Sequence, residues 1–384
     1  MTTNPPDRGP EDGRLAGAAT SAGTARYRER FAGRVSPDHF RQTAGLWLSS
    51  LGIGTYLGEP DEQDDKGYRD SVIAAVKAGC NVIDSAINYR FQRSERNVGE
   101  AIAGLTAAGF RRDEFVVATK GGFIPYDGGY PSSPSDWFRD QLLRPGLAQI
   151  DDVVANCHIM TPKYLEAQIE WSRGNLGLST LDIYYLHNPE TQLSEVDRPE
   201  FLMRVRAAFE MLEEKASAGL IGIYGMATWD GFRAAPDSPG YLSLKELVTV
   251  AEQVGGSGHH FRAIQLPLNL VMPEACLLAN QQLHGRRVSL LEAAAAAGMV
   301  VMASGSLLQG RVIGALTPAF AELLPGTKTN AQRGLQIVRS AGGLATALVG
   351  MKRTDHVAEN LGLAALPRLP AGETARILEM VRHR

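Results

Sequence analysis

The feature that most constrains the fold of this chain is a regular alternation of short apolar segments with longer amphipathic ones, beginning near residue 44. The apolar segments are continuous runs of Val, Ile, Leu and Tyr, which is typical of strands covered on both sides. Strands are predicted at about 46–56, 81–84, 115–120, 181–187, 221–228, 261–268, 300–304 and 347–351. Helices are predicted from apolar residues at helical spacing, at about 65–78, 94–108, 162–176, 199–218, 243–254, 289–297, 330–341 and 354–363.

A glycine stands at almost every joint between a predicted helix and the next strand. Glycine accepts the left-handed conformation that ends many helices. With 41 glycines in the chain some coincidence is expected, but six or more at the same offset indicate a repeated structural unit. The positions are Gly79, Gly109, Gly177, Gly219, Gly298 and Gly342–Gly343.

Eight strands that alternate with eight helices imply a parallel sheet, either closed into a barrel or open and doubly wound. The open sheet is usually marked by Gly-x-Gly-x-x-Gly after its first strand. Residues 51–55 read Leu-Gly-Ile-Gly-Thr, without the third glycine and without a helix directly after them. We therefore predict an α/β fold of the (β/α)₈ (TIM) barrel class.

The predicted domain organisation is one barrel over residues 41–384, preceded by a disordered extension over 1–40. The extension is rich in Gly, Ala, Pro, Thr and charge, and it lacks the apolar surface that offsets ordering entropy. Long loops are predicted after strand three (121–160) and after strand seven (307–329), with a C-terminal helix within 365–384. Loops on this side of a barrel build the active site, so the 121–160 insertion is interpreted as a lid or substrate wall.

Composition excludes several classes of function. A formal net charge of −3 gives no reason to expect nucleic acid or an anionic membrane as partner. The three cysteines are scattered, so neither a disulfide framework nor a zinc site is expected. No apolar run is long enough for a membrane span or a signal peptide, and a cytoplasmic location is expected.

Ionisable residues close three successive predicted strands: Asp84, Lys120 and His187. Such groups are almost never buried unless they are paired. The ends of parallel strands share one rim of a barrel, so Asp84 and Lys120 are expected to form an ion pair. Tyr89, in the loop after Asp84, is predicted to reach the same rim. There the ammonium of Lys120 would lower the pKa of the Tyr89 phenol and make it a general acid. Each residue alone has a structural explanation, such as capping a turn, but the four together favour a reaction centre.

These residues lie in segments that resemble signatures of the aldo-keto reductase superfamily. Asp84-Ser-Ala-Ile-Asn-Tyr89 is similar to its Asp-Thr-Ala segment with a tyrosine five residues on, and Ser94-Glu95 with Gly99 is similar to the helix that follows. Ala118-Thr-Lys120 and the strand from Leu181 to His187 resemble two further signatures. The resemblance implies a (β/α)₈ barrel that reduces a carbonyl compound with a nicotinamide cofactor. By resemblance, Tyr89 donates the proton, Asp84 holds Lys120, Lys120 tunes Tyr89, and His187 orients the carbonyl.

The resemblance also implies a set of cofactor-binding positions, with NADP(H) preferred over NAD(H). Several positions depart from the family pattern: Ala227 replaces a serine, Leu268 replaces a stacking tyrosine, and Gly350 and His356 occupy the usual places of a basic pair. Lys352 and Arg353 lie nearby and are candidates for a 2′-phosphate, although they could equally be surface residues. The full set is Gly54, Thr55, Tyr56, Asp84, Thr228, Gln265, Gly305, Ser306, Leu307, Gly350, Met351, Lys352, Arg353, Glu359 and Asn360.

Two other functions remain open at this stage. A barrel of this kind can act as a slow or non-catalytic cofactor sensor, as the β subunits of potassium channels do within the same family. A Schiff-base lyase would use Lys120 as a nucleophile, but a neighbouring Asp84 should keep that amine charged. The substrate itself is not indicated, because the aromatic residues of the long loops, including Tyr126, Tyr130 and Trp229, suit packing as well as binding.

Overall fold

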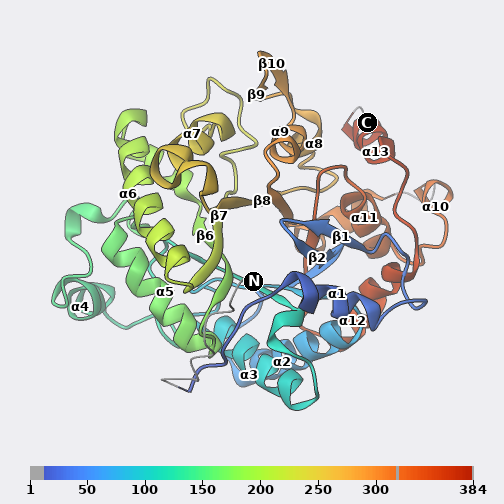
Figure 1. Cartoon of the computed structure of the whole chain (residues 1–384), viewed down its shortest axis with the longest axis horizontal. Helices are drawn as coiled ribbons and strands as arrows, with labels where there is room; N and C mark the ends of the chain where they lie inside the picture. The colour runs from blue at the N-terminus through green and yellow to red at the C-terminus, as the bar shows by residue number, and fades with distance from the viewer. Residues whose placement is uncertain (1–12, 317–319, 383–384) are drawn as a thin grey trace, which may run out of the picture.

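The computed structural model describes residues 13–316 and 320–382, and its centre is a closed barrel of eight parallel strands. Figure 1 shows the helices arranged in a ring around it. The fold class predicted from the sequence is therefore confirmed. In barrel order the strands are β3 (Leu51–Gly54), β4 (Val82–Asp84), β5 (Val116–Gly121), β6 (Leu181–His187), β7 (Ile221–Ala227), β8 (Phe261–Pro267), β11 (Val300–Ser304) and β12 (Thr346–Gly350).

Each barrel strand is followed by a helix on the outside, within a few residues of the predicted position. These helices are α2 (Glu62–Lys77), α3 (Arg93–Ala107), α5 (Pro162–Leu176), α6 (Arg198–Ser217), α7 (Leu244–Gly255), α9 (Leu290–Ala296), α11 (Asn330–Arg339) and α12 (Thr354–Leu361). Helix α6 shows why the spacing of apolar residues predicts these helices. The Asp197 side chain caps it by accepting a hydrogen bond from the Glu200 amide at 3.0 Å, and Val205, Phe209 and Leu212 are buried against the barrel.

The apolar core has two layers. Inside the barrel, small and medium side chains from alternate strand positions pack together, among them Val82, Ala118, Ile183 and Met302. The larger layer fills the space between the strands and the helices. Because both faces of each strand are covered, the strands read as continuous apolar runs.

The predicted first strand over 46–56 is two strands in the structure. Strand β2 (Leu46–Ser49) pairs antiparallel with β1 (Phe40–Thr43), and only β3 joins the barrel. Leu48 of β2 contributes to the apolar cluster inside the barrel. The periodicity of the sequence does not reveal the break at Ser50, because the segments on both sides of it are apolar.

The prediction of a disordered extension over residues 1–40 is wrong for residues 13–40; residues 1–12 lie outside the described part of the chain. Helix α1 (Ser21–Glu29) packs on the barrel, where the buried Tyr27 hydroxyl donates to the carbonyl of Val76 at 2.5 Å. Arg26 and Arg30 both pair with Glu114, whose side chain is fully buried. The segment is ordered because the barrel supplies the apolar and acidic surface that its own composition lacks.

Several short elements escaped the sequence analysis because they carry too few residues to show a period. A hairpin of β9 (Gln281–Leu283) and β10 (Arg286–Val288) follows α8 (Glu274–Leu277). The 121–160 insertion contains α4 (Pro134–Phe138), and the connection between β11 and α11 contains α10 (Phe320–Leu323). The expected C-terminal helix is α13 (Glu373–Arg382), with Ile377 buried. Over the described ranges, no helix combines the length and apolarity required to cross a membrane.

Candidate active site

An ion pair between Lys120 and Asp84 lies at the rim where the barrel strands end. The Lys120 Nζ atom is 2.7 Å from Asp84 Oδ2 and also donates to the carbonyl of Ser85 at 2.8 Å. The other carboxylate oxygen of Asp84 accepts from the Gln265 amide at 2.7 Å. Lys120 is fully buried and Asp84 is 4% exposed, so the desolvated charges depend on each other.

Tyr89 brings its ring beside this pair from the loop that follows β4. Lys120 Nζ lies 4.8 Å from the centroid of the Tyr89 ring. The rings of Tyr56 and His187 meet the Tyr89 ring edge-on, with centroids 4.9 and 5.7 Å away. The structure therefore brings the four predicted residues of the reaction centre together on adjacent elements.

The electrostatics of Tyr89 differ from the sequence prediction. Burial raises the pKa of Tyr89 well above its usual value, and the charge of Asp84 and the neighbouring Tyr56 raise it further. The net lowering expected from Lys120 is not found, because burial and the charge of Asp84 outweigh the effect of the ammonium, which donates its hydrogen bonds to Asp84 and Ser85. Burial also lowers the pKa of Lys120, an effect that Asp84 opposes. Tyr89 is therefore a neutral phenol that carries its proton throughout the physiological range.

His187 closes β6 as a neutral imidazole. Burial lowers its pKa well below the usual value, and the nearby Lys120 and His158 lower it further. Its Nδ1 atom is buried without a hydrogen-bond partner among the described residues. A buried unsatisfied polar atom calls for an explanation, and at the mouth of a barrel a bound molecule is the natural one.

The predicted nicotinamide end of the cofactor site surrounds the same rim. Thr55 donates to the carbonyl of Asp84 at 3.1 Å and contacts the hydroxyl of Ser85 at 3.0 Å. Next to it, Gly54 pairs with Gly350 across β3 and β12, and Tyr56 is 57% exposed. Gln265 is engaged with Asp84 rather than free.

Two residues of the predicted cofactor set carry buried oxygens without partners in the described structure: Thr228 Oγ1 after β7 and Asn360 Oδ1 in α12. The first stands where the resemblance places the carboxamide, and the second at the adenosine end. These residues therefore fit a nicotinamide dinucleotide. Leu268 is fully buried in the core, so it offers no open face to a nicotinamide ring.

The remaining predicted positions lie after β11 and β12. Gly305, Ser306 and Leu307 follow β11, where the Ser306 hydroxyl donates to the carbonyl of Ala303 at 3.3 Å. After β12, Met351 is fully buried, and Glu359 accepts a hydrogen bond from Thr329 at 2.6 Å.

The two cations proposed for a 2′-phosphate already have acidic partners. The Lys352 ammonium is 2.9 Å from Asp64, and Arg353 pairs with Asp355 in an exposed contact. A 2′-phosphate would therefore compete with two carboxylates for these side chains.

The sequence analysis missed a carboxylate that shapes the rim. One oxygen of Glu190 accepts hydrogen bonds from the backbone amides of Trp229, Asp230 and Gly231, at 2.7 to 3.3 Å. Glu190 thus fixes the turn that follows Thr228. Its position three residues after His187 was visible, but nothing in the sequence indicated which amides it would meet.

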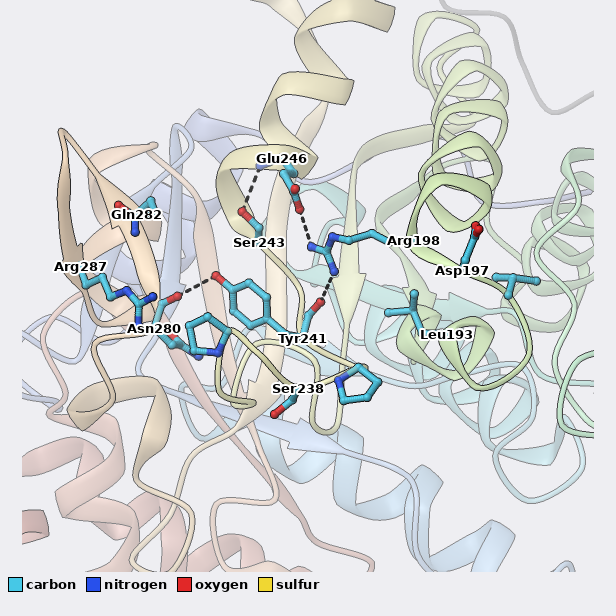
Figure 2. Close-up of a pocket in the computed structure, with 13 residues that line it drawn as sticks. Leu193, Asp197, Arg198, Ser238, Tyr241, Ser243, Glu246, Asn280, Gln282 and Arg287 are labelled. Atoms are coloured by element: carbon cyan, nitrogen blue, oxygen red, sulfur yellow. Dashed lines mark hydrogen bonds and ion pairs between the residues drawn. The ribbon is translucent and has the colours of Figure 1, made fainter.

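A surface hollow of about 510 Å³ lies apart from this site, between the N-terminal ends of α6 and α7 and the β9–β10 hairpin (Figure 2). There Arg198 pairs with Glu246, and the Tyr241 hydroxyl donates to the carbonyl of Asn280 at 2.7 Å. None of the predicted site residues lines it.

Comparisons with known proteins agree with this geometry. The sequence profile of the Aldo/keto reductase family matches residues 50–236. The chain is 27% identical over 193 residues to the NADH-specific methylglyoxal reductase of Escherichia coli, covering 49% of this chain and 51% of that protein. It is 29% identical over 190 residues to a D-threo-aldose 1-dehydrogenase of a Pseudomonas species, covering 48% and 51%. The chain thus spans about half the length of the curated relatives it matches.

The fold is similar to that of solved aldo/keto reductases over most of the chain. An aldo/keto reductase from Klebsiella pneumoniae, solved in complex with NADP and acetate, superposes with a TM-score of 0.60 at 20% identity, over 89% of this chain and 95% of that one. The closed barrel and the profile match agree with each other over the first half of the chain. The chain is therefore similar to the aldo/keto reductase family over residues 50–236 and shares the barrel fold of its solved members.

Proposed function

We propose that this protein is an NAD(P)H-dependent reductase that converts an aldehyde or ketone to an alcohol, with Tyr89 as the general acid. The observation that carries the proposal is a phenol that lies beside an imidazole and a buried Lys–Asp pair. A bound reduced nicotinamide would supply a hydride, with its two electrons, to the carbonyl carbon. The electron pair of the C=O π bond then moves to oxygen, which takes the Tyr89 proton and becomes the alcohol.

The roles of the other residues follow from their charges. After proton transfer Tyr89 is a phenolate, and the Lys120 ammonium close to its ring stabilises that negative charge. Asp84 keeps Lys120 in place, and Gln265 keeps Asp84 in place. His187, neutral and with one N–H to donate, orients the carbonyl oxygen.

We further propose NADP(H) as the preferred cofactor, with Lys352 and Arg353 as the cations for its 2′-phosphate. The exposed Arg353–Asp355 pair contributes about 1 kcal/mol or less, so a doubly charged phosphate can draw Arg353 away from Asp355. Lys352 is half-exposed but its partner Asp64 is buried, so the phosphate must compete more strongly for that ammonium. Replacing both with alanine should weaken NADPH binding more than NADH binding in a fluorescence titration. Equal weakening of the two would remove them from the phosphate site.

The experiment that tests the proposed function is a fluorescence titration with NADPH and NADH, followed by a panel of carbonyl compounds. Cofactor oxidation is the expected result. Tight binding without oxidation of any mixture would instead favour a cofactor-sensing module, a function that the altered Ala227 and Leu268 positions would suit.

The Tyr89→Phe variant tests the role of the phenol directly. It should lower turnover by a factor on the order of 10² or more, with cofactor affinity nearly unchanged. Turnover near that of the wild type would end the assignment of Tyr89 as the general acid.

A further inference from the structure

The 121–160 insertion is fastened to the barrel mouth by its two ends. Phe123 and His158 form an antiparallel bridge. The Ile159 amide donates to the carbonyl of Gly122 at 2.8 Å, and the Ile124 amide donates to that of Cys157 at 2.9 Å. Between these ends the insertion forms a small apolar cluster together with residues of α5. The part next to the reaction centre is therefore a fixed wall.

His158 ties this wall to the end of β6. Its Nε2 atom donates to the main-chain carbonyl of His187 at 2.8 Å, and its Nδ1 atom accepts from the Gln192 amide at 2.8 Å. Arg204 donates to the oxygen of the same amide at 2.6 Å. His158 is 1% exposed, and burial lowers its pKa to about 4, so its protonation state and orientation are fixed.

Gly122 makes this contact possible. Its φ is +134°, a conformation that residues with side chains rarely adopt. A Cβ atom here would lie 2.7 Å from His158 Nε2 and 3.2 Å from the carbonyl oxygen of His187. Any other residue would push His158 away from β6.

The consequence of this construction is the placement of Phe123. Its ring stands edge-on between two imidazoles, 5.1 Å from His158 and 5.0 Å from His187 between centroids. Its carbonyl accepts hydrogen bonds from Tyr164 at 3.0 Å and Gln168 at 2.8 Å. Phe123 is only half-buried, and its apolar ring lies beside the histidine that would orient the carbonyl.

We propose that Phe123 is a specificity-determining residue that contacts the group attached to the carbonyl carbon, and that the site selects carbonyl compounds bearing an aromatic or other flat apolar substituent. His158 is its positioning residue. This inference rests on the proposed reductase function. Polyhydroxylated aldehydes would lose water at this wall without gaining hydrogen bonds from the ring. Two further exposed aromatics at the rim, Tyr56 and Trp229, extend the same apolar character.

The test compares kcat/KM for benzaldehyde and glyceraldehyde in the wild type, Phe123→Ala and Phe123→Leu. The wild type should favour benzaldehyde, and both variants should lose about tenfold or more of that preference, mainly through KM. Phe123→Leu keeps an apolar side chain and guards against a folding defect in the alanine variant. Tyr130→Ala is the matched control, because Tyr130 is an aromatic residue of the insertion that is 70% exposed.

His158 is tested by a double-mutant cycle. His158→Ala should reduce the preference for benzaldehyde, and adding it to Phe123→Ala should cause little further loss, because both changes remove the same wall. Additive losses would overturn the positioning role. A wild type that favours glyceraldehyde, or a Phe123→Ala variant with unchanged preference, would overturn the substrate inference while leaving the reductase proposal standing. Cofactor binding without oxidation in the presence of any carbonyl compound would overturn both.

Discussion

Replacing Lys120 with methionine, alone and together with Asp84→Asn, should show separately how the Lys120–Asp84 pair affects the unfolding free energy and the turnover. The substitution removes the ammonium that contacts Asp84 Oδ2 at 2.7 Å and the carbonyl of Ser85 at 2.8 Å. Asp84 is 4% exposed and would keep one hydrogen bond, from Gln265. The variant thus leaves a buried carboxylate without its counter-charge.

The expected cost follows from these contacts. Removing one partner of a buried ion pair costs about 3–5 kcal/mol of unfolding free energy. The lost hydrogen bond to Ser85 adds about 1 kcal/mol, while the remaining bond from Gln265 offsets a similar amount. We therefore expect a loss of about 3–5 kcal/mol, a large part of the roughly 5–15 kcal/mol that stabilises a typical domain.

The second substitution, Asp84→Asn, removes the stranded charge. In the Lys120→Met/Asp84→Asn double variant the new side-chain amide oxygen can still accept from Gln265, so most of the lost stability should return, to within about 1–2 kcal/mol of the wild type. Turnover should stay as low as in the single variant, since no ammonium faces Tyr89.

Urea unfolding followed by circular dichroism gives the unfolding free energies of the wild type, the single variant and the double variant. Lys66→Met is the control, because Lys66 pairs with Asp70 on the surface of α2 and should cost no more than about 0.5 kcal/mol. A loss below about 1 kcal/mol in Lys120→Met would refute the argument that the pair is desolvated. A double variant less stable than the single one would refute the argument that the stranded charge is the cost.

Two further predictions concern the backbone and the pH dependence. Gly122→Ala should cost about 1–3 kcal/mol from its positive φ alone and loosen the hold of His158 on β6, whereas Gly129→Ala, with open space around its Cβ, should be nearly neutral; equal unfolding free energies for the two variants would contradict the steric argument. The rate of carbonyl reduction should be flat between about pH 6 and 9. The protonated form of Tyr89 is lost only as pH rises through a raised pKa, and the neutral form of His187 is lost only as pH falls through a lowered one. A limb of the kcat/KM profile inside that window would contradict this assignment.

The reaction centre was largely predictable because its residues break the pattern of the strands that carry them. An acid, an amine and an imidazole at the ends of three buried strands need partners, and the barrel topology puts those ends on one rim. The pKa of Tyr89 was not predictable in the same way. It depends first on how deeply the fold buries the phenol, and then on the nearby charge of Asp84. The spacing of residues along the chain contains neither.

The wall around Phe123 could not be read from the sequence at all. His158 lies in no periodic segment and in no motif. Its role is evident only from the hydrogen bond between its imidazole and the main chain of β6. Helix α1 is a similar case, since its composition suggests disorder while the barrel supplies the surface that orders it.

The sequence by itself determined the alternation of strands and helices, and with it the barrel and the rim on which the polar strand ends gather. These features follow from local periodicity and from the fixed direction of parallel strands. Only the tertiary structure decided which buried groups share hydrogen bonds, which protons they keep and which aromatic ring faces the reaction centre. Those outcomes depend on contacts of 2.7 to 5 Å between segments far apart in the chain, and on burial that no single segment provides.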